Sequence, residues 1–286
     1  MTRFIRRSRN VTVIAALFAL AVSGPALADP WIPAAGHGTV QPMVRLFQSS
    51  GAYSAAGFTT STIPASTQQE TQLRVTGVAG IGDGFSIEYD LRAGRVRTAR
   101  TRHVRIGRVK RYQQIAKSAS GLEDQEVGLN YGLVQTKPFA DSVTFNLVFP
   151  TGSTSSVPQL GSGHFAVEPD FQAGIARGRF SATMLAGARI FFDSGTTEVR
   201  GSFYADMRVL PRISLFGTAF VSRTVQQAKS LPLTDLGEVY NIVRVGGGVE
   251  YRLTRILRPF AEYEVTVAGQ GIHAGRRIVF GVALKY

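Results

Sequence analysis

Ser162 and His164, two positions apart in a glycine-rich stretch, are the residues whose types most directly suggest chemistry. A serine activated by a histidine can hydrolyse esters when a third residue orients the imidazole ring. The sequence places no orienting acid or amide beside His164, and the His-x-Ser pattern of membrane phospholipases is missing. A surface histidine is the simpler interpretation, so we predict no catalytic residue.

The sequence also shows no pattern typical of a metal site or of a phosphate-binding loop. The histidines and acids do not recur at the spacings typical of zinc ligands, and the chain has no cysteine. We therefore predict no metal site and no cofactor. Gly246-Gly247-Gly248 lacks the lysine that follows a phosphate-binding loop. Within a strand, such glycines leave room for side chains from neighbouring strands.

A larger set of charged residues shares one feature, because each member alternates with apolar neighbours and all lie on one face of an extended chain. The members are Glu88, Asp90, Arg92, Asp124, Glu126, Glu168, Asp170, Arg189, Asp206, Arg208, Arg244, Glu250, Glu262 and Glu264, joined by Arg45, Arg74, Arg200, Arg252, Arg277 and Lys285. The two signs nearly balance. Buried charges persist only when they are paired, so an enclosed face of this kind predicts a ladder of ion pairs.

A second charged feature is the segment between Asp90 and Glu123, which contains no acid. Its basic residues are Arg92, Arg95, Arg97, Arg100, Arg102, Arg105, Arg108, Lys110, Arg111 and Lys117. Three interpretations compete: arginine contacts with lipopolysaccharide phosphates, a funnel for anionic solutes and nucleic-acid binding. Nucleic-acid binders interleave aromatic residues for stacking, and these are nearly absent here. We rank lipid contact first and predict no nucleic-acid partner.

The elements that must position these charges are strands, because apolar residues recur with a period of two. From Arg277 to Tyr286 the even positions are apolar, whereas the odd positions are mostly small or charged. Twelve such segments begin near Val40, Glu70, Phe85, Leu122, Ser142, Phe165, Phe180, Glu198, Ser214, Tyr240, Phe260 and Arg277. Most have the length of a tilted strand that crosses a bilayer.

The connections between these segments alternate in length. Short turns are expected at 81–84, 137–138, 178–179, 211–212 and 254–255, and most longer links, at 94–120, 151–163 and 227–239, fall between them. Short turns on the periplasmic side and long loops outside are typical of outer-membrane barrels. The sequence therefore predicts an all-β protein, a closed antiparallel transmembrane β-barrel of about twelve strands with both termini in the periplasm. The last strand should pair with the first, near residues 40–47, because an open edge in lipid leaves backbone groups unpaired.

A soluble β-sandwich is the main alternative, since it alternates in the same way. In a sandwich the apolar face forms the core and the polar face meets water. The polar face here mixes glycines with charges of opposite sign, which is more typical of a crowded barrel lumen. We therefore favour the barrel.

The N-terminal residues have the composition of an export signal. Four arginines precede an apolar run of about a dozen residues, and Ala26-Leu27-Ala28 offers small residues for cleavage. A retained membrane anchor is less plausible, because a helical span needs about 20 apolar residues. We expect a signal peptide at 1–28, a single barrel domain at 29–286 and an outer-membrane location in a Gram-negative bacterium. The net charge of +13 falls to +9 without this signal.

The C-terminal residues resemble the insertion signal of outer-membrane barrels. That signal has a glycine, a hydrophobic residue three positions later and a terminal aromatic, here Gly281, Leu284 and Tyr286. Val279 departs from it, where a polar residue is usual. The match implies recognition of the last strand by the barrel-assembly machinery.

Two internal stretches resemble one family of outer-membrane proteins. Residues 121–124, followed by 127–131, resemble the Gly-x-Gly-Asp…Gly-x-x-Tyr strand of the putative meta-pathway phenol-degradation family, with Glu123 in place of its second glycine. Residues 149–152 and 161–163 are similar to its Leu-Pro-Thr-Gly and Gly-Ser-Gly stretches. The resemblance implies a twelve-stranded barrel that passes small or hydrophobic molecules.

Three classes of function follow from these observations. The first is an outer-membrane channel or transporter for small solutes, including aromatic, hydrophobic or anionic ones. The second is a structural or lipopolysaccharide-binding barrel with a plugged lumen, because twelve strands fall between filled barrels of about eight and open ones of about 16. The third is a lipid-modifying enzyme. The expected partners are outer-membrane lipid, lipopolysaccharide, the assembly machinery and small solutes.

Overall fold

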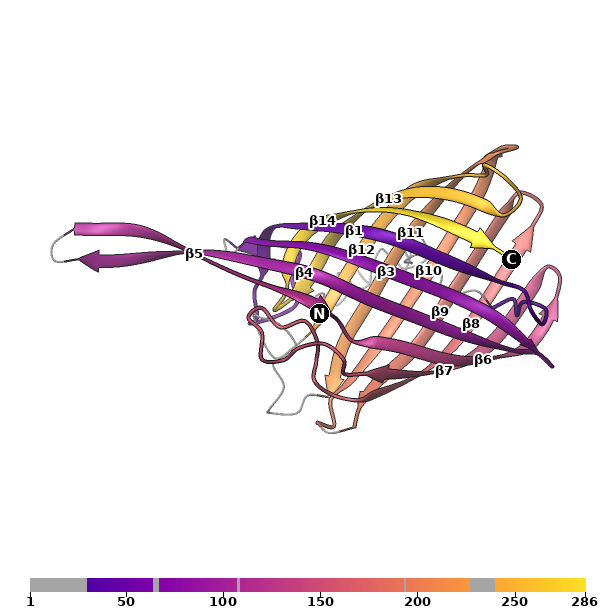
Figure 1. The fold of residues 1–286 in the computed structure, drawn as a ribbon, viewed down its shortest axis with the longest axis horizontal. Coiled ribbons are helices and arrows are strands. Elements are labelled where there is room, and N and C mark those ends of the chain that lie inside the picture. The colour runs from indigo at the N-terminus through magenta and orange to yellow at the C-terminus, as the bar shows by residue number, and fades with distance from the viewer. Residues whose placement is uncertain (1–29, 64–66, 107–108, 193, 227–239) are drawn as a thin grey trace, which may run out of the picture.

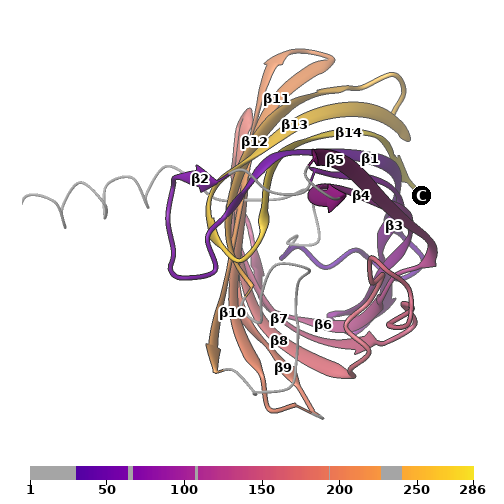
Figure 2. The same ribbon diagram turned by 90° about the vertical axis from the view of Figure 1, so that its left-hand side faces the viewer.

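The protein forms a closed antiparallel β-barrel of twelve strands in a computed structural model (Figures 1 and 2). The structure describes residues 30–63, 67–106, 109–192, 194–226 and 240–286, with side chains of residues 50 and 101–114 left out. The predicted signal peptide at 1–28 lies outside these residues. In the described part of the chain, no helix is long and apolar enough to span a membrane.

The twelve barrel strands correspond to the twelve alternating segments. They are β1 (Gly38–Tyr53), β3 (Thr67–Gly82), β4 (Phe85–Ile106), β6 (Gln125–Thr136), β7 (Phe139–Phe149), β8 (Ala166–Arg177), β9 (Phe180–Phe191), β10 (Thr197–Leu210), β11 (Ile213–Gln226), β12 (Asn241–Tyr251), β13 (Leu257–Gln270) and β14 (His273–Lys285). Two further strands, β2 (Thr62–Ile63) and β5 (Val109–Leu122), pair with β1 and β4 beyond the barrel circuit. The predicted fold class is confirmed.

Pairing of β14 with β1 closes the barrel. The register joins Val40 to Leu284 and Phe47 to Arg277, which is the pairing expected from the sequence. Closure leaves no open sheet edge along the wall, so every barrel strand has hydrogen-bonded neighbours on both sides.

Burial is inverted relative to a soluble protein. On β6 the side chains of Glu126 and Asn130 are buried, whereas those of Val127, Leu129 and Tyr131 on the opposite face are exposed. The same inversion recurs along the other strands: charges lie inside and large hydrophobic residues outside. A β-sandwich would bury its apolar face, so this pattern excludes that alternative and places a hydrocarbon-facing surface on the outside.

The region 94–120 differs from the expected polar link. β4 continues past the barrel wall, and β5 pairs with it from Ala93↔Leu122 to Ile106↔Val109, so the segment forms a long hairpin that projects from one end (Figure 1). We expected a long link here but did not predict its strands, because a hairpin beyond the barrel wall needs no apolar face and so lacks the alternation of the barrel strands. Its backbone hydrogen bonds and its alternating Val, Thr and Arg residues suit extended structure.

The short turns all lie at the other end of the barrel, and the predicted positions of these turns are confirmed. At 81–84 the backbone of Gly82, Asp83 and Gly84 has positive φ angles of 102°, 50° and 78°. Glycine adopts such angles without steric cost, and aspartate is one of the few other residues that tolerate them. Gly38 and Tyr286 exchange backbone hydrogen bonds at this end. The start of β1 and the C-terminus therefore lie beside the short turns.

Residues 30–37 fold into the barrel at the short-turn end rather than hanging outside it. The Ile32 amide donates to Gln135 Oε1 at 3.0 Å, and Gln135 Nε2 donates to the Pro30 carbonyl at 2.7 Å. The rings of Pro30 and Trp31 pack against Gly174 of β8, and Figure 2 shows this segment inside the ring of strands. The N-terminal segment thus crosses part of one mouth of the lumen.

Candidate functional site in the barrel lumen

A continuous chain of ion pairs runs along one side of the lumen. Its members alternate in sign and come from β3, β4, β6, β9, β8 and β10, in the order Arg74, Asp90, Arg92, Glu126, Arg189, Glu168 and Arg200. Arg74 lies 2.6 Å from Asp90, Arg92 lies 2.9 Å from Glu126, and Arg189 lies 2.5 Å from Glu168. Each acid therefore has two arginine partners.

A second cluster on the opposite side centres on Glu264 of β13. One carboxylate oxygen, Oε2, lies 3.1 Å from Arg277, 3.7 Å from Arg244 and 3.8 Å from Arg45. Arg45 also donates to Gln72 Oε1 at 3.1 Å. Three guanidinium groups thus share one carboxylate, so this cluster carries a surplus of positive charge.

One aromatic ring connects the two clusters, and a glutamine extends the second cluster. Phe220 of β11 lies between them, with the guanidinium carbons of Arg200 and Arg244 at 5.3 and 5.9 Å from its ring centroid. On the other side, Gln72 accepts from Arg45 and donates to Glu123 at 2.5 Å. Cation–π contact stabilises a desolvated guanidinium by about 1–2 kcal/mol. We call the whole arrangement the charged belt.

Three other predicted lumen acids are buried but hydrogen-bond to neutral side chains. These bonds join Glu88 to Asn130 at 2.9 Å, Asp170 to Asn146 at 3.0 Å and Glu262 to Thr218 at 2.5 Å. The lumen wall therefore also contains hydrogen-bonded carboxyl groups outside the chain of ion pairs.

Besides these three acids, and besides Arg252 and Lys285 at the short turns, four predicted members of the ladder lie outside the belt. Arg208 is exposed at the short-turn end of β10, and Asp206 hydrogen-bonds to Ser181. Glu250 pairs with Arg258 at 3.3 Å near the same end. Period-two alternation assigns a face but not a height along the barrel axis, which is why these residues were grouped with the others.

Asp124, the fourth, fastens a loop instead of joining the belt. Its carboxylate accepts hydrogen bonds from the Gly152 amide at 3.1 Å and from the amide and hydroxyl of Ser162, both at 2.7 Å. Gly152 and Gly161 pack so closely that a Cβ on either would overlap the other's backbone. The stretches that resemble the phenol-degradation family therefore meet at one point, where they hold loop 151–163 against the lumen.

The glycines of β12 leave room for side chains inside the barrel, as expected. A Cβ on Gly248 would lie 2.3 Å from the Phe216 ring, and a Cβ on Gly246 would lie 2.5 Å from the Thr218 hydroxyl oxygen. These residues let the side chains of β11 lie across the neighbouring strand. Glycine here serves packing rather than phosphate binding.

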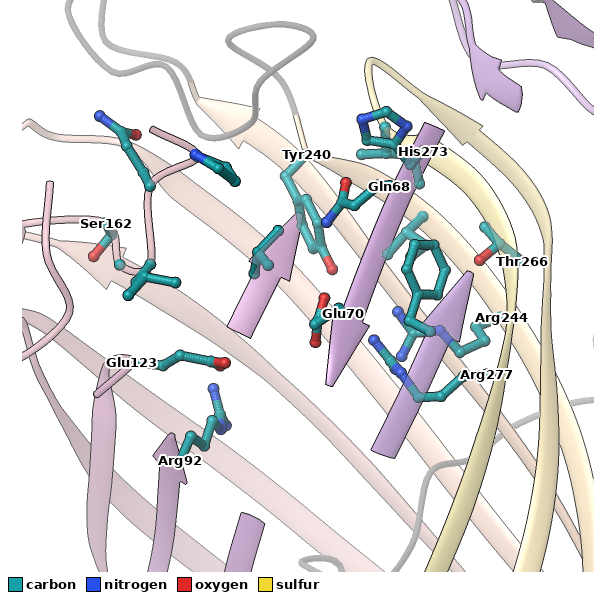
Figure 3. Close-up of a pocket in the computed structure, with 18 of the residues that line it drawn as sticks. Gln68, Glu70, Arg92, Glu123, Ser162, Tyr240, Arg244, Thr266, His273 and Arg277 are labelled. Carbon is teal, nitrogen blue, oxygen red and sulfur yellow. The ribbon is translucent and has the colours of Figure 1, made fainter. Parts of the chain in front are cut away.

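Two adjoining cavities occupy the lumen between the belt and the projecting hairpin. The first, shown in Figure 3, has a volume of about 420 Å³ and reaches from the belt to loop 151–163 and His273. The second, of about 280 Å³, lies along the belt itself. Both are lined by Arg92, Arg200, Tyr240, Arg244 and Arg277. The lumen thus contains space for water and small solutes at its most highly charged level.

The basic segment lies on the hairpin formed by β4 and β5. Arg95, Arg97 and Arg100 are exposed. Arg102, Arg105, Lys110 and Arg111 lie on its strands, but their side chains are outside the described residues, as is all of Arg108. Arg95 and Arg97 share the outer face of β4 with Leu91.

Ser162 and His164 are joined through the backbone of the histidine. The His164 amide donates to Ser162 Oγ at 3.3 Å, and the Ser162 hydroxyl donates to Asp124. This is the bonding of a loop clamp rather than of an activated nucleophile. Among the described residues, no group of three or more His, Asp or Glu could hold a metal ion.

Two belt residues and one residue of the cavity wall, Tyr240, were not singled out from the sequence. Gln72 is neutral, and Phe220 lies in a stretch of β11 with apolar residues on both faces, so neither stood out. Tyr240 was recognised only as the start of a segment. Their roles depend on the neighbouring strands, and no local signal could have identified them.

The closed barrel, with its apolar exterior and charged interior, defines the chain as a β-barrel of the transmembrane type. No family model matches the sequence, and no curated protein matches it. The resemblance to the phenol-degradation family therefore stays a prediction.

Solved structures support the fold. The COG4313 outer membrane channel from Pseudomonas putida F1 is similar with a TM-score of 0.69 at 13% identity, covering 92% of this chain and 100% of that one. The translocator domain of autotransporter NalP from Neisseria meningitidis has a TM-score of 0.51 at 12% identity, covering 97% of this chain and 98% of that one. At these identities the likeness concerns the fold alone.

Proposed function

We propose that the protein is a passive outer-membrane channel for small solutes. The observation that carries this proposal is the pair of adjoining cavities inside a closed barrel whose exterior is apolar and whose interior is charged. An interior lined by paired arginines and acids suits polar solutes. The structural similarity to the Pseudomonas putida outer membrane channel supports the same function.

Planar-bilayer recordings of the refolded protein test this proposal. We expect small, steady openings that favour anions at low salt, because the cavity linings carry more arginines than acids and because salt screens exposed charges. Folding is checked independently by heat-modifiable migration on gels. Correctly folded protein that never conducts would contradict the channel and favour a plugged structural barrel.

A lipopolysaccharide-binding surface is a second candidate, favoured by the outer face of the hairpin. The strand register places Arg95 beside Thr71 and Ser120, and Arg97 beside Gln69 and Ser118. The next row toward the barrel is apolar, formed by Leu73, Ala93 and Leu122. These arginines therefore begin where the hydrocarbon-facing surface ends, at the level of lipid phosphates.

Replacing both Arg95 and Arg97 by Gln should weaken stabilisation of the barrel by lipopolysaccharide. Each basic residue near an anionic lipid surface contributes about 1 kcal/mol. The measurement is the heat-modification midpoint in vesicles with and without lipopolysaccharide. Lys117→Gln, on the opposite face of the hairpin, is the matched control. An equal loss in both variants would contradict a specific lipid contact by the outer face.

The other expectations remain proposals of the same kind. We place the short turns and both chain ends in the periplasm, after removal of residues 1–28, and the hairpin outside the cell. We propose recognition of Gly281, Leu284 and Tyr286 by the assembly machinery. A lipid-modifying activity is not proposed, because Ser162 is engaged in holding loop 151–163.

A further inference from the structure

The larger cavity is amphipathic. Its apolar lining residues are Phe47, at the level of its register partner Arg277, and Val96, Leu160, Phe191, Ile242 and Ile272. The level it shares with the smaller cavity is lined by arginines and by Tyr240. A solute that fills this space meets apolar side chains at one end and guanidinium groups at the other.

The charge at the shared level is positive. The smaller cavity is lined by six arginines and only three acids, Glu126, Glu168 and Glu264. The acids of the larger cavity, Glu70, Glu123 and Glu198, face five arginines. Two of these acids are engaged, since Gln72 donates to Glu123 and Ser222 donates to Glu198 at 3.3 Å.

The cluster around Glu264 has more donors than its carboxylate can accept. Three arginines carry five N–H donors each, whereas one carboxylate offers about four acceptor sites. The side chains of Arg45 and Arg277 are only 9% and 10% exposed. The Nε atoms of both have no hydrogen-bond partner in the described part of the chain. Because these two Nε atoms are themselves buried, the donors in excess of the Glu264 acceptor sites are the terminal guanidinium nitrogens of the cluster.

Aromatic rings border the same arginines. The Arg277 guanidinium carbon lies 5.6 Å from the centroid of Phe47, and Arg244 lies over Phe220. Figure 3 shows Tyr240 projecting into the cavity from the opposite side, with its hydroxyl directed toward Glu70. Flat rings beside forked donors suit a ligand that has a flat apolar body and a carboxylate.

We propose that the lumen binds small organic carboxylates with an apolar body, with the carboxylate held by Arg244 and Arg277 and the body lying against Phe47. This inference rests on the proposed channel function, because the solute reaches the site by entering the lumen. Binding here makes the passage selective among anions. The proposed ligand class is defined by a carboxylate joined to an apolar body, and benzoate is the probe for it.

Calorimetric titration of the folded full-length protein in detergent tests the site without requiring conduction. We expect benzoate to bind roughly tenfold tighter than acetate, because burial of the ring adds apolar contact. Benzyl alcohol, which lacks the charge, should bind much more weakly. Titration into empty micelles corrects for partitioning of benzoate into detergent.

Three variants separate the site from general damage to the barrel. In Arg244→Gln/Arg277→Gln, benzoate affinity should fall by about tenfold or more through loss of charge-assisted hydrogen bonds. Arg244→Lys/Arg277→Lys keeps the charge but loses the fork and should also bind benzoate less well. Phe47→Leu should weaken benzoate more than acetate. Arg258→Gln, which neutralises an arginine near the short turns, should bind as the wild type does.

The outcomes distinguish this proposal from the channel itself. Benzoate binding in detergent with silent bilayers would contradict the channel and leave the site standing. A conducting barrel that binds benzoate no better than acetate would overturn the site and leave the channel standing. Unchanged benzoate affinity in heat-modifiable Arg244→Gln/Arg277→Gln protein would also overturn the site. If that variant does not fold, a Phe47→Leu variant that prefers benzoate over acetate as strongly as the wild type does would overturn the site.

Discussion

Glu126→Gln is expected to lower the free energy of unfolding of the barrel by about 3–5 kcal/mol, which is the usual cost of breaking a buried ion pair. Glu126 is the link between Arg92 and Arg189, and its side chain is only 8% exposed. Without its charge, two buried guanidinium groups lose a shared partner. Reversible unfolding in urea, followed by tryptophan fluorescence in lipid vesicles, measures the change.

Glu250→Gln is the matched control for this prediction. Glu250 pairs with Arg258 near the short turns, where both side chains are 21% exposed. Solvent-exposed ion pairs contribute about 0–1 kcal/mol. This half-buried pair is more accessible to water than Glu126 is, so Glu250→Gln should lower the free energy of unfolding clearly less than Glu126→Gln does. Similar stabilities of Glu126→Gln and Glu250→Gln would show that the charged belt does not hold the barrel together.

Asp124→Ala is expected to increase single-channel conductance severalfold and to add rapid fluctuations to the current. The carboxylate makes three hydrogen bonds to Gly152 and Ser162. Removal of a charged acceptor costs about 1.5–3 kcal/mol for each such bond. Loop 151–163 lines the larger cavity through Pro158, Gln159, Leu160, Gly161 and Ser162, so its release should widen the path.

Recordings in planar bilayers at fixed salt compare this variant with Asp83→Asn. Asp83 lies in a short turn at the opposite end, with a positive φ angle that asparagine tolerates, so the control removes one acid without freeing a loop. A barrel that folds, conducts and shows wild-type openings in Asp124→Ala would contradict a role of the loop in narrowing the lumen.

The position of Glu126 shows which features of the charged belt the sequence alone could predict. Alternation placed Glu126 on the lumen face, but it placed Asp206 and Arg208 there with equal weight. The structure joins Glu126 to two arginines and leaves Arg208 exposed at the mouth. Height along the barrel axis depends on the tilt and stagger of all the strands, and local periodicity contains no information about that.

Loop 151–163 and the N-terminal segment show the same limit. The sequence drew attention to Asp124 and Gly152 through a family resemblance, yet it gave no reason for them to touch. Nothing in the sequence of residues 30–37 predicted that they would lie inside the mouth of the lumen, where the structure places them. Both arrangements depend on contacts between residues that lie far apart in the chain.

The sequence by itself determined the twelve strands, their inner and outer faces and the short turns, because side-chain alternation and turn chemistry are local properties of the backbone. Only the tertiary structure decided which arginine meets which acid, which loop narrows the lumen and where the cavities lie. Those features follow from strand register and barrel closure, which bring residues such as Arg45 and Glu264 to within 3.8 Å of each other.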